Sequence, residues 1–306
     1  MESASHPSSG NILPAWLKVS GWGGAEYTRV QNMVQRSGLV TVCEEAQCPN
    51  RGACWNHGTA TFMLCGAVCT RACGFCATRT AKPEPLDTTE PERVAEAVAT
   101  MGVKHAVLTM VTRDDLPDGA AAHIAATIRT VRKAAPQTII ETLTSDFRGK
   151  EEALQTVVRA HPHVFNHNLE TVERLTPLVR FRAQYRLSLQ VLQRAKEMAQ
   201  NLIATKSGLM LGLGETRDEL LRTMDDLLEH GVSMLTMGQY LRPTPRHLPV
   251  IRYLKPDEFD ELRDIALQKG FSHVASGPLI RSSHHDANFR PSADILTAIA
   301  RLSNGE

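Results

Sequence analysis

The sequence lacks the features that send a chain out of the cytoplasm or into a membrane. Its first residues, MESASHPSSGNILPAWLKV, have no apolar core behind a basic start, and no stretch approaches about 18 uninterrupted apolar residues. The 306 residues carry a formal net charge of only +1, and aromatic residues make up 5%. We therefore expect a cytoplasmic protein without a membrane or nucleic acid as partner, because nucleic-acid binding requires a basic surface.

Two common ligand-binding patterns are missing as well. No Gly-x-Gly-x-x-Gly follows the first predicted strand, which argues against a dinucleotide-binding fold. No helical pair of histidines four residues apart stands beside an acid, which argues against a mononuclear metal site. The 7 cysteines all lie between Cys43 and Cys76 in a chain without a secretion signal, so the sequence favours metal binding over a disulfide framework.

Short apolar segments alternate with amphipathic helical patterns from about residue 60 onward. The stretch TRDELLRTMDDLLEHG predicts a helix with a capping box of Thr216 and Glu219 and an end at Gly231. Another helix is predicted at 91–102. Six buried strands are predicted at 61–68, 105–111, 138–144, 164–169, 205–213 and 233–241. The alternation implies a parallel sheet, so the predicted fold class is α/β, a partial (β/α)6 TIM-type barrel.

Three cysteines in CTRACGFC, namely Cys69, Cys73 and Cys76, form a compact group after the first predicted strand. Structural zinc sites usually use two well-separated cysteine pairs, whereas three thiolates can hold a four-iron cluster that keeps one iron open for a small ligand. The spacing Cys-x3-Cys-x2-Cys, with Phe75 before the third cysteine, resembles the radical S-adenosylmethionine (SAM) superfamily. That resemblance implies a 4Fe-4S cluster that reduces SAM and releases a 5′-deoxyadenosyl radical, which removes hydrogen from unactivated carbon.

The same resemblance implies SAM contacts on later strands. In NHNLET, Asn168 and Glu170 are two residues apart, so both side chains point to one face and can bind the ribose hydroxyls, while His167 points the other way and packs. Ser188 is the first candidate for the methionine carboxylate and Arg180 the second. The candidate SAM contacts are Phe75, Asn168, Glu170, Arg180, Ser188, Met210, which is expected to face the adenine, and Gly212.

A second triplet, Cys43, Cys48 and Cys54 in TVCEEAQCPNRGACWNHGTATFM, resembles the lipoyl synthase family. Further similar segments run along nearly the whole chain: AWLKV, VTRDDLPDGAAAH, NHNLETV, KSGLMLGLGE, MGQYLRPTPRHLPVIRY and VASGPLIRSS. The resemblance implies that these cysteines and Ser283 hold an auxiliary 4Fe-4S cluster. It also implies a division into an N-terminal extension at 1–60 that carries this triplet, the barrel at 61–270, and a C-terminal segment at 271–306 that supplies Ser283 and caps the cluster.

By this resemblance the enzyme is a radical SAM sulfurtransferase in lipoate biosynthesis. It inserts two sulfur atoms from the auxiliary cluster at carbons 6 and 8 of an octanoyl group on a carrier lysine, and it uses SAM and two 4Fe-4S clusters. Cys69, Cys73, Cys76 and Ser283 are the catalytic candidates. The implied partners are octanoylated lipoyl-carrier domains, such as E2 subunits of 2-oxoacid dehydrogenases and the glycine-cleavage H protein, and a reducing donor such as ferredoxin or flavodoxin.

Departures from the family's usual motifs keep other hypotheses open. The chain has RSSHHD in place of Arg-Ser-Ser-Tyr-His-Ala and CGFC in place of Cys-Pro-Phe-Cys, so a diverged paralogue is one alternative. Another sulfur-inserting radical SAM enzyme similar to biotin synthase is a second, and a non-catalytic iron–sulfur or zinc scaffold is a third. Cys65 lies outside both triplets and is predicted to be a buried structural thiol.

Overall fold

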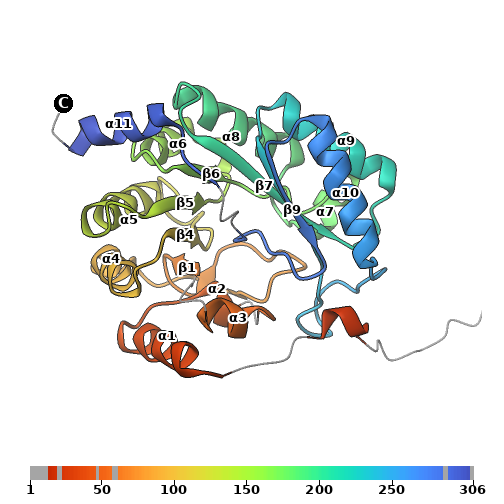
Figure 1. The fold of residues 1–306 in the computed structure, drawn as a ribbon, viewed down its shortest axis with the longest axis horizontal. Helices are drawn as coiled ribbons and strands as arrows, with labels where there is room; N and C mark the ends of the chain where they lie inside the picture. Colours follow the sequence, from red (N-terminus) through yellow and green to blue (C-terminus); the bar gives the residue numbers. More distant parts are fainter. Residues whose placement is uncertain (1–12, 19–22, 46–47, 57–60, 285–288, 304–306) are drawn as a thin grey trace, which may run out of the picture.

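A curved, all-parallel sheet forms the centre of the molecule in the computed structural model, which describes residues 13–18, 23–45, 48–56, 61–284 and 289–303 (Figure 1). Its 7 strands lie in the order β1-β4-β5-β6-β7-β8-β9. The strands are β1 (Thr61–Leu64), β4 (His105–Met110), β5 (Ile139–Leu143), β6 (Val164–Asn166), β7 (Ala204–Leu211), β8 (Met234–Gln239) and β9 (His273–Gly277). Six of them coincide with the predicted strands, and the α/β partial-barrel prediction is confirmed.

The seventh strand, β9, was not predicted. It pairs with β8 in parallel, with Met234 opposite His273 and Gly238 opposite Gly277, and so extends the sheet into the residues assigned to the C-terminal segment. All five of its residues are only partly buried, because β9 is an edge strand. Its sequence, HVASG, therefore lacks the apolar run by which the central strands were found. No backbone pairing among the described residues joins β9 to β1, so the barrel is open along that side.

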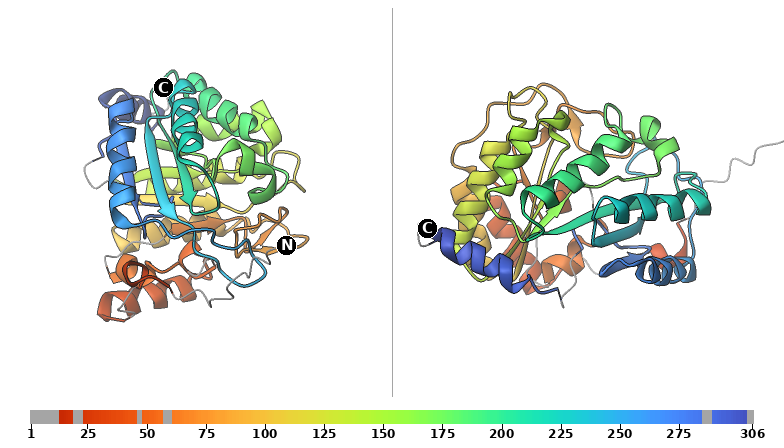
Figure 2. Two further views of the ribbon diagram at one scale, coloured as in Figure 1. Left: turned by 90° about the vertical axis from the view of Figure 1, so that its right-hand side faces the viewer. Right: turned by 90° about the horizontal axis from the view of Figure 1, so that it is seen from above.

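Helices cover the outer, convex face of the sheet (Figures 1 and 2). They are α4 (Glu90–Met101), α5 (Ala121–Ala134), α6 (Glu151–Val158), α8 (Tyr185–Met198), α9 (Arg217–Glu229) and α10 (Pro256–Lys269). The helix predicted from its capping box is α9, and both hydrogen bonds of the box, between Thr216 and Glu219, are present. The other predicted helix is α4, which ends at Gly102 in the left-handed conformation (φ 62°).

Smaller elements precede the barrel, follow it, or lie in the loops between its strands and helices. Thr41 forms an isolated antiparallel bridge with Phe62, which places the N-terminal helices beside β1, and the ring of fully buried Trp55 lies 5.1 Å from that of Tyr27. These elements are η1 (Ala15–Leu17), α1 (Ala25–Arg36), α2 (Val42–Glu45), α3 (Arg51–Asn56), the ribbon β2 (Val68–Cys69) with β3 (Arg79–Thr80), η2 (Phe147–Gly149), η3 (Glu173–Leu175), α7 (Thr176–Val179) and α11 (Ala293–Ser303). Parts of the predicted extension, 1–12, 19–22, 46–47 and 57–60, lie outside the described residues.

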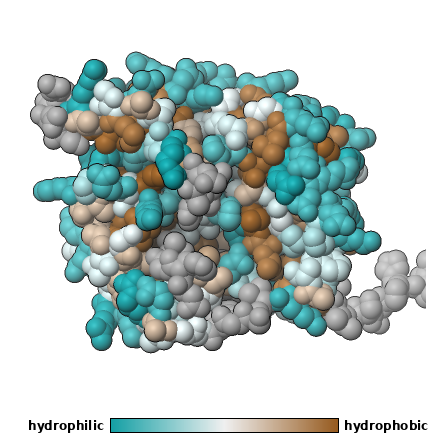
Figure 3. Space-filling view, viewed as in Figure 1, coloured by the Kyte–Doolittle hydropathy of each residue, from teal (hydrophilic) through white to brown (hydrophobic). Residues whose placement is uncertain are grey.

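The surface separates polar from apolar side chains in the way expected for helices around a buried sheet. In the view of Figure 3, hydrophilic residues cover most of the outer helices, and apolar residues show mainly between them. None of the helices that the structure describes is both long enough and apolar enough to span a membrane.

Candidate active site

A cavity of about 490 Å³ lies at the carboxyl ends of the strands, where the loops of a β/α barrel place functional groups. It is bounded on one side by α2 and the loop after it, and on the other by the segment that follows β9. Five of the six cysteines of the two triplets line it, together with the C-terminal serine: Cys43, Cys48, Cys69, Cys73, Cys76 and Ser283. Residues far apart in the sequence thus meet around one space.

The first triplet sits on a loop that runs from the last residue of β2. Cys69 ends that strand, and the backbone N–H of Cys76 donates to the carbonyl of Cys73 at 3.1 Å, which makes a tight turn. Burial, together with the neighbouring thiols, raises the pKa of the Cys73 thiol to about 12, and burial also raises the pKa of Cys76. The three thiols are partly buried, and thiolates crowded on one loop need cations nearby to neutralise them.

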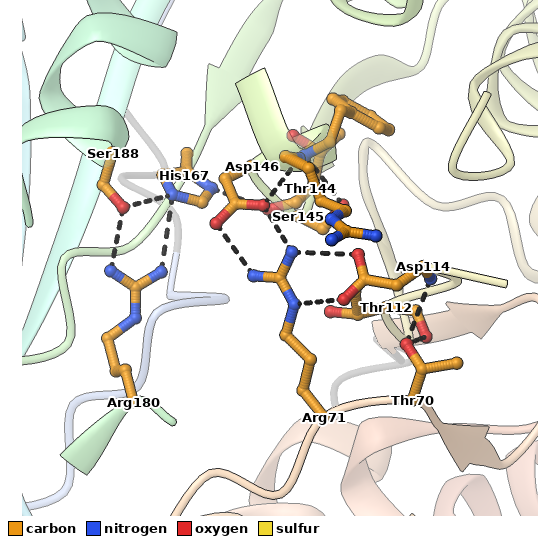
Figure 4. A network of polar contacts seen from close by, with 12 residues as sticks. Thr70, Arg71, Thr112, Asp114, Thr144, Ser145, Asp146, His167, Arg180 and Ser188 are labelled. Atoms are coloured by element: carbon orange, nitrogen blue, oxygen red, sulfur yellow. Dashed lines mark hydrogen bonds and ion pairs between the residues drawn. The ribbon is translucent and has the colours of Figure 1, made fainter. Parts of the chain in front are cut away.

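An arginine between the first two of these cysteines anchors the loop to the barrel (Figure 4). Buried Arg71 pairs with Asp114 at 2.8 Å and with Asp146 at 2.7 Å, using both edges of its guanidinium. The two carboxylates come from the loops after β4 and β5. Burial alone would raise the pKa of Asp146, but the hydrogen bonds from Arg71 outweigh it and lower the pKa to about 2. The loop is therefore fixed to the barrel by the ion pairs of Arg71 with Asp114 and Asp146.

Asn168 and Glu170 follow β6 and share one face, as predicted. Asn168 Nδ2 donates to Glu170 Oε1 at 3.0 Å, and both residues line the cavity. Glu170 has φ 64° and bridges to Leu209 of β7, so a local turn rather than a regular strand directs the pair. Asn168 Oδ1 and Thr144 Oγ1 are buried without a hydrogen-bond partner among the described residues. Two oxygen atoms beside the cavity are thus available to a ligand that carries hydroxyl or amino groups.

Arg180, Ser188 and His167 form a chain of hydrogen bonds whose two end members, Arg180 and His167, line the cavity (Figure 4). Arg180 Nη1 donates to Ser188 Oγ at 2.9 Å, Ser188 Oγ lies 3.0 Å from His167 Nε2, and His167 Nδ1 lies 2.9 Å from the carbonyl of Thr144. Burial, with Arg180 nearby, lowers the pKa of His167 to about 4, so the imidazole is neutral. Nδ1 then donates to Thr144, and Nε2 accepts from the serine hydroxyl.

The positions of these three residues differ from what their expected roles require. The hydroxyl of Ser188 already donates to His167 and accepts from Arg180, and Ser188 does not line the cavity, whereas Arg180 does. His167 is buried as expected, but it hydrogen-bonds and lines the cavity rather than only packing. Arg180 is accordingly the better placed of the two carboxylate candidates.

Of the remaining SAM candidates, two line the cavity and one does not. Phe75 and Met210 line the cavity. Gly212 does not; it follows the end of β7 with φ 98°, and a Cβ there would lie 2.3 Å from both the carbonyl of Arg252 and the side-chain amide of Gln239. Glycine at 212 is explained by this close packing of the backbone.

The second triplet lies on the N-terminal helices beside β1. Cys43 is in α2 and Cys54 in α3, while Cys48 lies between the two helices. Burial raises the pKa of Cys43 to about 11, and the neighbouring Cys48 and Cys54 thiols add to the rise. Cys54 is partly buried and is not among the residues that line the cavity, although the other two are.

Comparison with known proteins identifies the family. Residues 63–227 match the model of the radical SAM superfamily. The lipoyl synthase of Shouchella clausii is 56% identical over 294 residues, which cover 96% of this chain and 94% of that protein. The lipoyl synthase of Rubrobacter xylanophilus is 55% identical over 272 residues, 89% of this chain and 84% of its own. The chain belongs to the lipoyl synthase family.

The family's enzymes are radical SAM enzymes, and the sequence-based prediction of that family and enzyme class is confirmed. Solved structures support the fold: an FeFe-hydrogenase maturase from Carboxydothermus hydrogenoformans has a TM-score of 0.52 at 14% identity, covering 91% of this chain and 78% of its own. Methylornithine synthase has a TM-score of 0.51 at 12% identity, covering 79% and 80%. Membership of the lipoyl synthase family disfavours the biotin synthase-like and scaffold hypotheses.

The residues at the cavity fit the groups that a radical SAM family implies, a 4Fe-4S cluster and SAM. Soft thiolates are the usual ligands of iron–sulfur clusters, and burial raises the pKa values of the Cys73 and Cys76 thiols, so their thiolates need positive charge beside them. The unpartnered oxygens of Asn168 and Thr144 fit hydroxyl groups of a nucleoside. Buried Arg180 fits a carboxylate.

Cys65 is buried, as predicted, and belongs to a separate group outside the cavity. Its backbone N–H donates to Glu90 Oε2 at 2.8 Å, and the same oxygen lies 2.6 Å from His123 Nε2. Thiol, carboxylate and imidazole lie within 4.8 Å of one another, and the carboxylate is satisfied by these partners. The group ties β1 to α4 and α5.

Sequence reasoning missed the supporting network of Arg71, Asp114 and Asp146. One signal was available, because Arg71 stands inside CTRAC and Asp114 inside VTRDD, two motifs used for the resemblance. Asp146 carried no signal, since an acid after a strand is common in loops.

Proposed function

We propose that the chain inserts two sulfur atoms, at carbons 6 and 8, into an octanoyl group attached to a lysine of a carrier domain, and so makes the lipoyl cofactor. The single observation that carries this proposal is the gathering of Cys43, Cys48, Cys69, Cys73, Cys76 and Ser283 around one cavity. A site with a radical source on one side and a sulfur source on the other needs both sets of ligands within the same enclosed space.

In this proposal Cys69, Cys73 and Cys76 hold the first 4Fe-4S cluster, and SAM fills the part of the cavity next to it. When bound and reduced, these two groups supply the 5′-deoxyadenosyl radical. Arg180 binds the methionine carboxylate, while Ser188 and His167 hold the guanidinium in place from behind. Asn168 and Glu170 bind the ribose hydroxyls, and Phe75 and Met210 pack against the rest of the nucleoside.

Cys43, Cys48, Cys54 and Ser283 hold the auxiliary cluster, which is the source of both sulfur atoms and is therefore also a substrate. Three of its ligands come from α2, α3 and the loop between them, and the fourth comes from beyond β9. An alkoxide is a hard ligand beside three soft thiolates, so the serine-bound iron is the weakest-held member of the set. Ser283 thus suits a cluster that must be dismantled during turnover.

The octanoyl chain lies between the two clusters, where the enclosure excludes water from the radical chemistry. The proposed partners are octanoylated carrier domains of the E2 and glycine-cleavage H types, with a ferredoxin or flavodoxin as electron donor. We also propose a cytoplasmic location, since each of these partners is a soluble protein.

The proposal is tested with cluster-reconstituted protein, dithionite, SAM and an octanoyl-lysyl peptide under anaerobic conditions, followed by mass spectrometry. The expected result is a peptide that has gained two sulfur atoms, with two molecules of 5′-deoxyadenosine released for each product. Release of 5′-deoxyadenosine without sulfur insertion would point to another substrate for the same radical chemistry, which is the outcome expected of a diverged paralogue. Release of neither product would contradict the proposal.

A further inference from the structure

Ser283 lies in a tight turn that belongs to no helix or strand. The N–H of His284 donates to the carbonyl of Arg281 at 2.8 Å, so Ser282 and Ser283 occupy the middle of the turn. The turn lies in the segment that follows β9, outside any helix or strand. The position of the Ser283 hydroxyl therefore depends on what holds this turn.

Two side chains from the barrel interior reach the carbonyls on either side of Ser283. Lys206 Nζ donates to the carbonyl of His284 at 2.6 Å, and Asn166 Nδ2 lies 3.5 Å from the carbonyl of Ser282. Asn166 on β6 and Lys206 on β7 are direct partners in the sheet register. Residues at neighbouring positions of the sheet thus contact the backbone carbonyls immediately before and immediately after the serine.

A buried carboxylate orients both of these side chains. Glu141 Oε1 accepts from Lys206 Nζ at 2.8 Å and from Asn166 Nδ2 at 2.7 Å, while Glu141 Oε2 lies 3.1 Å from His105 Nε2. The side chains of Glu141 and Lys206 are 0% and 1% exposed. A buried ion pair of this kind gives little net stability compared with apolar side chains of the same volume. The pair instead orients the side chains of Lys206 and Asn166 toward the carbonyls of His284 and Ser282, a role that its contribution to stability does not explain.

The other end of the segment is held independently. Asn50 Nδ2 donates to the carbonyl of Leu279 at 2.6 Å, which ties the segment to the loop between Cys48 and Cys54. A Cβ on Gly238 would lie 2.0 Å from the carbonyl oxygen of Ile280, so the segment packs directly against β8. Among the contacts of the described residues, those of Lys206 and Asn166 hold the far end of the segment, which carries Ser283.

We infer that Lys206, helped by Asn166 and oriented by Glu141, is a positioning residue that fixes the turn Arg281–His284 and so sets the Ser283 hydroxyl at the auxiliary cluster. This inference rests on the proposed function only in naming the group that Ser283 reaches. The contacts of Lys206 and Asn166 with the turn do not depend on that function.

The test compares two double variants that differ only in whether residue 206 can donate a hydrogen bond. Glu141→Gln removes the buried negative charge in both, so that neither leaves an unpaired carboxylate, which alone could unfold the chain. It is combined with Lys206→Met, which cannot donate, or with Lys206→Gln, which can. Arg132→Met serves as a control, because partly buried Arg132 donates to the carbonyls of Ala160 and His161, away from the cavity.

Hydrogen–deuterium exchange of peptides covering residues 279–284 is measured first, because it needs no cluster and no substrate. The Met double variant is expected to exchange the His284 amide faster than the Gln double variant, whereas Arg132→Met leaves it unchanged. In the reconstituted enzyme, the Met double variant is expected to release 5′-deoxyadenosine normally while sulfur insertion falls by roughly a hundredfold, the cost of an ångström-scale misplacement of a reacting group.

Equal exchange and equal sulfur insertion in the two double variants would overturn the inference. Its failure is distinguishable from failure of the proposed function. If the parent enzyme inserted no sulfur, the proposed function would be wrong, and the exchange of the His284 amide would still decide whether residue 206 holds the turn.

Discussion

The guanidinium of Arg180 donates to the hydroxyl of Ser188 at 2.9 Å, and that hydroxyl is in turn 3.0 Å from His167. The serine therefore acts on the cavity through the arginine, which alone of this pair lines it. Ser188, which was expected to contact the methionine carboxylate, thus lies behind Arg180, which can make that contact.

Replacing Arg180 should weaken SAM binding more than replacing Ser188. Arg180→Met removes a charged hydrogen bond to the carboxylate, whose loss costs about 1.5–3 kcal/mol, or roughly tenfold to a hundredfold in affinity. Ser188→Ala leaves the guanidinium in place and only loosens it, so a severalfold loss is expected. Anaerobic calorimetry with SAM measures both. A larger loss in Ser188→Ala than in Arg180→Met would show that the hydroxyl is the direct contact.

Cys43→Ala should separate the two halves of the reaction. Without this ligand the auxiliary cluster is lost, so the iron content falls from about eight to about four per chain, the difference of one four-iron cluster. Sulfur insertion is abolished while 5′-deoxyadenosine is still released. Cys65→Ala is the matched control, because Cys65 is also a buried thiol but belongs to the group of Glu90 and His123. Iron loss in Cys65→Ala would contradict the assignment.

Gly238→Ala should displace the segment that carries Ser283. The new Cβ would lie 2.0 Å from the carbonyl oxygen of Ile280, a backbone atom that cannot move without shifting the segment. Sulfur insertion and auxiliary iron are expected to fall, with 5′-deoxyadenosine release retained. Gly277→Ala is the control, since its Cβ would meet only a side-chain carbon of Ile280 at 3.3 Å. Equal effects of the two variants on sulfur insertion would count against this explanation.

The ion pair of Arg71 with Asp146 should make stability depend on pH. The pKa of Asp146 is lowered from 3.8 to about 2, so its contribution is complete above the unfolded value and is lost as the pH falls toward about 2. Asp146→Asn is expected to lower the free energy of unfolding by roughly 2 kcal/mol at neutral pH. Urea titrations at neutral pH and at about pH 3 measure this, and the gap between variant and parent should narrow at the lower pH. A gap that stays constant would assign the loss to packing.

The sequence alone was sufficient for features that depend on local patterns. Six strands are short, mainly apolar segments, α9 carries its own capping box, and the cysteine triplets are defined by spacing. It was insufficient where tertiary contacts decide. The edge strand β9 has no apolar run, and the partners of Ser188 come from β6 and from beyond α7. Lys206 and Glu141 are polar residues within strands, and only the folded barrel shows that they face each other.

The contact between Asn50 and Leu279 joins positions separated by 229 residues, and it has a consequence for how the protein is made. A ribosome releases the N-terminal helices long before it reaches Ser283, and chains begin to fold from the end that emerges first. The segment with Ser283 is therefore made long after Cys43, Cys48 and Cys54, and their proposed site is completed only near the end of translation. A chain that ended before Ser283 would lack the proposed fourth ligand of the auxiliary cluster, and it would also lose Phe289 and Ile295, which are buried in the core.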